Sequence, residues 1–281
     1  WTLYLFHVFS KNELSRKMSD KERTMTVRVR FAPSPTGFLH IGGARTALYS
    51  SIFAKRNKGT FVLRVEDTDL ERSKKEYEES QIEDLKWLGI EYDEGPDKPG
   101  DCGPYRQSER IELYKKYATQ LVEKGLAYPC FCTDEELDAK RKKAEEEKRA
   151  PHYDGTCRDL DPEVAKARIE KGEKFTIRFK VPKKTITVQD LIRGEVTFPD
   201  DMVGDFVILR SNGLPVYNFC CVVDDWLMKM THVIRAEDHL PNTMRQVMIY
   251  EALEAPLPHF AHVSLLVGHD RAKLSKRHGA T

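Results

Sequence analysis

The chain has 281 residues, of which 40% are hydrophobic and 32% charged, and its 46 basic residues nearly balance its 45 acidic ones. This length fits one large or two modest globular domains, and the balanced charge leaves any RNA contact to a local patch. No run reaches the roughly 18 apolar residues of a membrane span, and residues 3–9 lack the basic flank and cleavage site of a secretory signal. These features make a reducing compartment the default expectation, and the six cysteines are then expected to be thiols or metal ligands rather than disulfides.

The first part of the chain has the pattern of an α/β protein. Residues 1–24 are predicted to be a poorly ordered leader, and residues 26–32 (TVRVRFA) begin an alternation of apolar and polar side chains that predicts a strand. In chain order the pattern predicts a strand at 26–32, a helix at 43–57, a strand at 60–66 and helices near 74–88 and 107–124. Strand, helix and strand in this spacing form a βαβ unit with a parallel pair, so residues 25–107 are assigned to a nucleotide-binding domain.

A different pattern occupies residues 108–215, which are predicted to be an inserted α+β domain. Thr133 to Glu136 form a capping box that opens a highly charged helix through about Lys148. Short strands follow at 175–181, 194–198 and 205–210. A helix near 240–253 and a strand at 262–267 then restore the α/β pattern in residues 216–281. The predicted fold is a doubly wound, Rossmann-like parallel sheet interrupted by a small α+β insert, with ligand at the carboxyl ends of the strands.

The loop after the first strand, residues 32–43 (APSPTGFLHIGG), is suited to bind phosphate. It leads into a helix, whose N-terminus offers free backbone N–H groups and a partial positive charge. Gly42 and Gly43 leave the backbone open to close approach by a ligand, and His40 can donate a hydrogen bond to a phosphate oxygen. Near the other end of the chain, Lys273 and Lys276 flank Ser275 so that both lysines can converge on one polyphosphate.

Both loops resemble signatures of the class I aminoacyl-tRNA synthetases. PSPTGFLHIGG is similar to the first signature in its glutamyl and glutaminyl form, with Gly43 in place of the final histidine, and KLSKR is similar to the second. The resemblance covers residues 26–281 and implies that His40, Lys273 and Lys276 are catalytic, acting by electrostatic stabilisation of the phosphates. The implied ATP-binding set is His40, Gly42, Gly43, Glu237, Asp238, His239, Lys273, Leu274, Ser275 and Lys276.

Arginines at the ends of two strands are predicted to face the same crevice. Arg30 ends the first strand and Arg235 ends a later one, and guanidinium groups pair well with carboxylates such as the two of glutamate. The segments VRFAPSPTG and VIRAEDH resemble the glutamyl branch of the family, which implies that Glu66 takes the substrate ammonium. The implied glutamate-binding set is Arg30, Ala32, Ser34, Glu66, Tyr217, Cys221 and Arg235.

Three cysteines of the predicted insert form a partial zinc pattern. Cys130, Cys132 and Cys157 supply thiolates, and zinc normally takes four ligands. Asp159 is the candidate for the fourth position, with Tyr153 as an alternative. Unligated thiols remain the other reading of this segment.

The resemblance implies a glutamate–tRNA ligase that uses ATP and Mg²⁺ to form glutamyl-adenylate from L-glutamate and passes the glutamate to the 3′ end of tRNA. The insert is expected to hold the acceptor stem, and the chain is read as the catalytic half of a bacterial or organellar enzyme without the anticodon-binding domain. No membrane or DNA partner is expected. Bacterial cytoplasm, plastid and mitochondrion remain open, as does charging of tRNA for glutamine.

Three other functions remain as alternatives to this reading. The nearest is the shortened paralogue that glutamylates a modified base in tRNA for aspartate. The others are a nucleotidyltransferase that adenylates a small acid without RNA and a non-catalytic relative that serves as a binding module.

Overall fold

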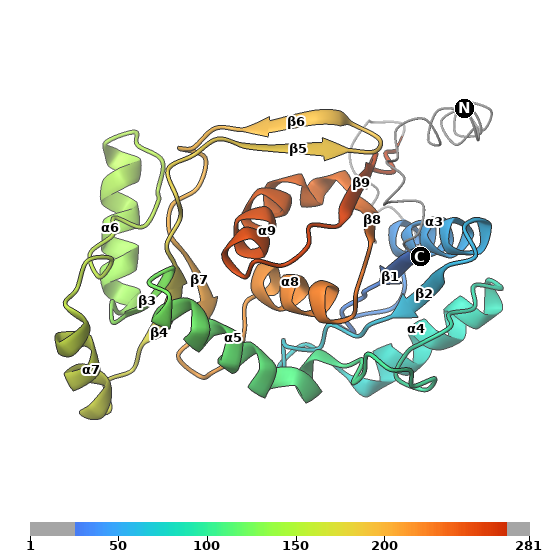
Figure 1. Cartoon of the computed structure of the whole chain (residues 1–281), viewed down its shortest axis with the longest axis horizontal. Helices are drawn as coiled ribbons and strands as arrows, with labels where there is room; N and C mark the ends of the chain where they lie inside the picture. The colour runs from blue at the N-terminus through green and yellow to red at the C-terminus, as the bar shows by residue number, and fades with distance from the viewer. Residues whose placement is uncertain (1–25, 269–281) are drawn as a thin grey trace.

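The computed structural model of the chain describes residues 26–268 (Figure 1). In chain order the elements are β1 (Arg28–Phe31), α3 (Ile41–Arg56), β2 (Thr60–Leu63), α4 (Lys75–Trp87), η2 (Gln107–Arg110), α5 (Ile111–Glu123), β3 (Ala127–Cys130), α6 (Asp134–Glu146), α7 (Pro162–Glu170), β4 (Thr176–Phe179), β5 (Ile186–Asp190), β6 (Gly194–Phe198), β7 (Phe206–Leu209), α8 (Tyr217–Leu227), β8 (His232–Ala236), η3 (Glu237–His239), α9 (Leu240–Ala252) and β9 (His259–Val263). The predicted leader, residues 1–24, lies outside the described residues, and no helix within residues 26–268 is long and apolar enough to cross a membrane.

Two parallel strand pairs from opposite ends of the chain meet at the centre of the fold. β1 pairs in parallel with β2, and β8 pairs in parallel with β9. The two pairs lie edge to edge where the Thr231 amide donates to the Arg28 carbonyl at 2.9 Å and the Arg28 amide donates to the Thr231 hydroxyl at 2.8 Å. This junction reverses the direction of strand order, which is where ligands bind in doubly wound folds.

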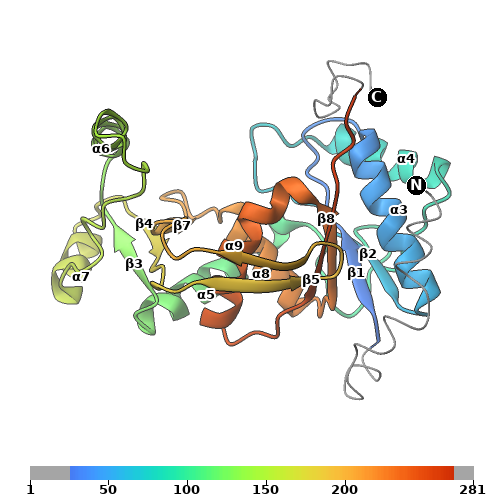
Figure 2. The same cartoon turned by 90° about the horizontal axis from the view of Figure 1, so that it is seen from above.

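Helices cover both faces of these central strands, as a doubly wound fold requires. Figure 2 shows β1, β2 and β8 between α3 on one side and α8 and α9 on the other. On the α3 side, Ala47 and Ala54 pack against Val29, Phe61 and Ile234 in one buried cluster. The predicted α/β fold class is therefore confirmed.

The middle of the chain forms a three-stranded antiparallel sheet in the order β3-β4-β7, flanked by α6 and α7 at the left of Figure 1. The capping box predicted at Thr133 is present and opens α6. A hairpin of β5 and β6 leaves this region and joins the sheet of β8 and β9, where Asp190 at the end of β5 pairs in parallel with Phe260 of β9. One buried core extends from β4 and β7 to α8 and α9, so these two parts of the chain are packed together.

The structure differs from the sequence-based expectation at several elements. The last strand begins at His259 and ends at Val263, not at 262–267, and α3 begins two residues before the expected position. Sequence patterns did not reveal α7, α8, β3 or β5. Helix α8 was missed because seven of its eleven residues are buried and none is exposed, so no polar, solvent-facing side marks it as a helix in the sequence.

Candidate active site

A pocket of about 570 Å³ opens where the carboxyl ends of β1 and β8 meet the start of α3. Most of its wall comes from segments that are far apart in sequence: the loop from β1 to α3, the end of β8 with η3, and the start of α8, with further residues after β2, on α4 and after β9. Of the residues predicted from the sequence, those lining it are Arg30, Ala32, Ser34, His40, Gly42, Gly43, Glu66, Tyr217, Arg235, Asp238 and His239. The structure thus brings most of the two predicted sets into one cavity.

His40 lies at the N-cap of α3, at the mouth of this pocket. Its Nδ1 atom accepts a hydrogen bond from the Gly43 amide at 3.1 Å, so in the neutral ring Nε2 carries the proton and is a donor. Gly42 permits this geometry, because a Cβ atom there would lie 3.0 Å from Cε1 of His40. The first turn of α3 therefore presents a histidine donor and backbone amides to the same space.

The loop that precedes His40 is held in place by a side chain of α4. Gln81 donates to the carbonyl of Gly37 at 2.7 Å and to that of Ser34 at 3.2 Å, and the Glu66 amide donates to the Pro33 carbonyl at 2.9 Å. These contacts fix the loop between β1 and α3 against the segment that follows β2.

Arg30 is buried, with 4% of its surface exposed, and its guanidinium group is held by Asp225 of α8. Its Nε and Nη2 atoms donate to the two carboxylate oxygens of Asp225 at 3.0 and 3.2 Å. Asp225 also accepts from Nη1 of Arg64 at 2.6 Å. The ion pair orients the guanidinium of Arg30 at the pocket wall.

Glu66 and Tyr217 complete the predicted glutamate-binding wall. Glu66 is buried and accepts from Nη2 of Arg64 at 3.0 Å, and burial raises the pKa of its carboxyl group. The hydroxyl group of Tyr217 lies 3.0 Å from Nδ1 of His239, and burial lowers the pKa of that histidine to about 4. His239 is therefore neutral at physiological pH.

Some predicted residues do not line the pocket. Cys221 lies beneath it, with its sulfur 3.8 Å from Nη2 of Arg30, and Glu237 pairs with Arg193 and accepts from the Leu265 amide at 2.7 Å. Lys273, Leu274, Ser275 and Lys276 lie outside the described residues.

Several pocket residues and supports were not found from the sequence. The loop residues Thr36 and Gly37, and Leu265 and Leu266 after β9, line the cavity. Asp225 supports it from below and had a usable signal, since two adjacent aspartates within the apolar run CCVVDDWL require buried partners. Arg64 had no such signal.

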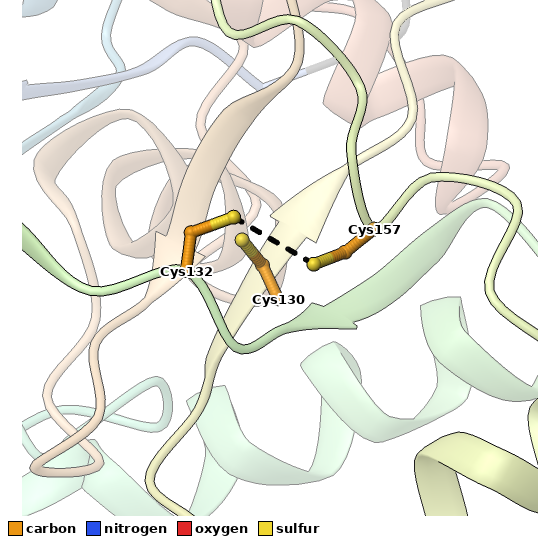
Figure 3. Close-up of side chains that lie close together, drawn as sticks. All are labelled: Cys130, Cys132 and Cys157. Atoms are coloured by element: carbon orange, nitrogen blue, oxygen red, sulfur yellow. Dashed lines mark hydrogen bonds between the residues drawn. The ribbon is translucent and has the colours of Figure 1, made fainter. Parts of the chain in front are cut away.

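The three cysteines predicted to bind zinc lie together in the middle region, as Figure 3 shows. Their sulfur atoms are all within 4.8 Å of one another, and those of Cys132 and Cys157 are 3.8 Å apart. Asp159 is not part of this group: its side chain is 84% exposed and its carboxylate lies 3.4 Å from Nζ of Lys180. The hydroxyl group of Tyr153 lies instead 3.4 Å from the sulfurs of both Cys130 and Cys132.

The sequence of the chain is similar to those of known proteins. A family profile described as tRNA synthetases class I (E and Q), catalytic domain, matches residues 26–281. A glutamate–tRNA ligase of Sulfurihydrogenibium sp. is 59% identical over 253 residues, which are 90% of this chain and 53% of that protein. One from Carboxydothermus hydrogenoformans is 57% identical over 256 residues, 91% of this chain and 53% of the relative.

Two solved structures of such ligases are also similar to this chain. A glutamate tRNA ligase from Elizabethkingia meningosepticum, crystallised in complex with its amino acid, has a TM-score of 0.86 and 43% sequence identity. The glutamate-tRNA synthetase of Elizabethkingia anophelis has a TM-score of 0.85 and 43% identity. Both alignments cover 91% of this chain and 53% of the other. The chain spans about half the length of the relatives that it matches.

Proposed function

Because the chain belongs to the family of class I tRNA synthetases for glutamate and glutamine, we propose that the protein is a glutamate–tRNA ligase. Its substrates are ATP, L-glutamate and tRNA. The observation that supports this most is the placement of two buried arginines, Arg30 and Arg235, in one pocket with the N-terminus of α3. A dicarboxylic amino acid needs cationic forks, and a triphosphate needs a helix N-terminus.

In the first step a carboxylate oxygen of glutamate attacks the α-phosphorus of ATP. The new bond is the acyl phosphate of glutamyl-adenylate, and the bond to pyrophosphate breaks. His40, which presents Nε2–H at the mouth of the pocket, donates to a phosphate oxygen as charge builds on it. Magnesium, when bound with ATP, supplies further charge neutralisation on the phosphates.

In the second step the terminal adenosine hydroxyl of tRNA attacks the acyl carbon, and AMP leaves. Arg30 and Arg235 hold the glutamate carboxylates, while Glu66 takes the ammonium group. Gly42, Gly43, Asp238 and His239 bind ATP, together with Lys273 and Lys276. Residues 108–215 are proposed to hold the acceptor stem, and the compartment is proposed to be bacterial cytoplasm or an organelle.

Zinc is proposed for the cluster of Cys130, Cys132 and Cys157, with the Tyr153 hydroxyl in place of Asp159. Three sulfurs and one oxygen form a four-ligand set of the kind that zinc takes. Although burial acts to raise it, the pKa of Cys130 is lowered, because Tyr153 and Arg178 donate hydrogen bonds to its sulfur. That environment favours the thiolate of Cys130, the form that binds a metal, whereas burial raises the pKa of Cys132 to about 11.

The test is charging of labelled glutamate onto total tRNA by the full-length protein, with ATP and magnesium. We expect label at the 3′ end of tRNA for glutamate, and none without ATP. His40→Ala should lower the rate by about 100- to 1000-fold. His259→Gln is the control, because His259 lies at the amino end of β9, away from the pocket.

Each alternative outcome identifies a different function. Label found only on tRNA for aspartate would indicate the base-modifying paralogue. No transfer to any tRNA would favour an RNA-independent adenylating enzyme or a non-catalytic relative. Unchanged charging by His40→Ala would remove the role assigned to that side chain.

A further inference from the structure

A buried series of hydrogen bonds connects the β5–β6 hairpin to Arg235 in the pocket. Asp190, at the end of β5, lies 2.6 Å from Nδ1 of His262 in β9. The opposite ring nitrogen of His262, Nε2, lies 3.1 Å from Nε of Arg235. Asp190, His262 and Arg235 are 5%, 0% and 4% exposed, so water does not compete for these contacts.

The chemistry of the three groups fixes the direction of each hydrogen bond. An ionised carboxylate only accepts and a guanidinium only donates. His262 therefore carries its proton on Nδ1, donates it to Asp190, and accepts from Arg235 with the bare Nε2. Burial lowers the pKa of His262, which maintains the neutral ring that this arrangement needs.

The remaining atoms of Arg235 show what this contact achieves. Nη2 donates to the hydroxyl oxygen of Thr243 at 2.7 Å, so His262 and Thr243 hold one edge of the guanidinium. Nη1 is buried and has no hydrogen-bond partner within the described residues, although Arg235 lines the pocket. A buried donor without a partner at a cavity wall is prepared for an incoming acceptor such as a carboxylate.

Asp190 also ties this arrangement to the turn of the hairpin. Its Oδ1 atom accepts from the amides of Ile192 and Arg193 at 2.9 Å each, and its carboxylate accepts from the His262 amide. Nε of Arg193 donates to the His262 carbonyl at 3.2 Å. The hairpin, which extends from the middle region of the chain, is thus built into the support of a pocket arginine.

We propose that Asp190 and His262 are positioning residues that orient Arg235 toward a carboxylate of the amino acid substrate. Through them, the pairing of the β5–β6 hairpin with β9 sets the affinity for glutamate. This inference rests on the proposed function, since it takes Arg235 to be a glutamate ligand.

The test uses two pairs of substitutions in the full-length protein, with charging measured at varied glutamate and at varied ATP. His262→Asn keeps a partner for Asp190 but is too short to reach Arg235, whereas His262→Gln can place an amide oxygen near the position of Nε2. We expect His262→Asn to raise KM for glutamate by about 10- to 100-fold, with kcat and KM for ATP within about threefold. His262→Gln should stay within about threefold of the wild type in all three constants.

Asp190→Asn tests the other end of the series. Its one oxygen is taken by the backbone amides of the turn, so its NH₂ group faces Nδ1 of His262 and forces the proton onto Nε2. With its proton on Nε2, His262 can no longer accept from Arg235 and faces the Thr243 hydroxyl oxygen, 2.9 Å away, as a donor. KM for glutamate should again rise by about 10-fold or more. His232→Gln is the matched control, because His232 is also a buried histidine but sits at the amino end of β8.

Each result decides the inference. Wild-type KM for glutamate in folded His262→Asn and Asp190→Asn would overturn it, as would an equal rise in His262→Gln or in His232→Gln. If His262→Asn does not fold, Asp190→Asn and His262→Gln decide between the outcomes. Absence of glutamate charging by the wild type would overturn the proposed function as well, whereas normal wild-type charging with unaltered variants overturns this inference alone.

Discussion

Asp225 forms ion pairs with two buried arginines through one carboxylate. It is 3% exposed and bonds to Arg30 and Arg64, neither of which is more than 5% exposed in its side chain. Although burial acts to raise it, these two cations lower the pKa of Asp225 to about 2. Its removal leaves the buried guanidinium of Arg30 without its ion-pair partner, while Arg64 keeps Glu66 at 3.0 Å.

We expect Asp225→Ala to lower the free energy of unfolding by about 3–5 kcal/mol, because breaking a buried ion pair leaves an uncompensated charge. Urea denaturation monitored by circular dichroism measures this. Asp138→Ala is the control: Asp138 pairs with Arg141 on the exposed face of α6, and its loss should change stability by less than about 1 kcal/mol. Equal effects of the two substitutions would contradict the assigned role of Asp225.

The cysteine cluster supports a prediction about zinc content. Elemental analysis of the purified protein should find about one zinc per chain, and Cys157→Ser should remove most of it. Tyr153→Phe should lower the retained zinc in a chelator titration, because it deletes the oxygen nearest two of the sulfurs. Asp159→Asn should behave as the wild type, and zinc loss in that variant would return Asp159 to the ligand set.

The residues of the candidate site could be predicted from the sequence only where they lie close together along the chain. His40, Gly42 and Gly43 were found because a histidine and glycines at the start of a helix form a motif within four residues. The partners of Arg235 could not be found, since Asp190 and His262 are 72 residues apart and their contact arises from strand pairing. Asp159 was wrongly placed because sequence proximity to Cys157 does not give the direction of a side chain.

A tight turn at the end of helix α3 leads the chain into β2. Lys58 has a φ of 52°, and Gly59 donates its amide to the Ala54 carbonyl at 2.9 Å while Lys58 bonds to Lys55. This is a Schellman ending, in which the left-handed residue is usually glycine. Here the glycine stands one position later, because a Cβ atom at residue 59 would lie 2.3 Å from the Val27 carbonyl oxygen.

Adjacent substitutions at this turn should therefore act in opposite directions. Lys58→Gly relieves the strained backbone of a side-chain-bearing residue and should stabilise the protein by about 0.5–1 kcal/mol. Gly59→Ala should destabilise it by about 1–3 kcal/mol, because the backbone at Val27, just before β1, has to move. Thermal unfolding of the two variants checks the pair, and a shift of both in the same direction would refute this account.

Elements with local signals were predicted well, and elements defined by distant partners were not. The helix α6 was expected because its capping box lies within four consecutive residues. The strand β5 has alternating burial, yet its role as an extra strand of the catalytic sheet depends on pairing with β9, about 70 residues later. No local pattern encodes that partner.

Buried neutral histidines should make the stability of the protein depend on pH. Burial, with a smaller contribution from His259, lowers the pKa of His232 to about 4, below its value in the unfolded chain. The unfolded state thus binds more protons as pH falls below about 6.5, so stability is full above that pH and declines toward pH 4. Between pH 7 and pH 5 this one group should contribute a loss of roughly 1–2 kcal/mol.

Urea titrations at several pH values measure this decline. His232→Phe keeps an aromatic ring against Phe53 but does not titrate, so its stability should fall less steeply with decreasing pH. An identical slope in the variant and the wild type would show that other groups cause the loss.

The junction of β1 with β8 also has a consequence for synthesis on the ribosome. Arg28 and Thr231 are separated by 203 residues, and at translation rates of about 5–20 residues per second the second strand emerges about 10–40 seconds after the first. During that interval Val29 and Phe31 lack Ile234 and Ala261, their later neighbours in the core. The nascent chain therefore carries an open strand edge until β8 has been made, a natural place for a chaperone to act, and the pocket forms only once β8 has joined β1.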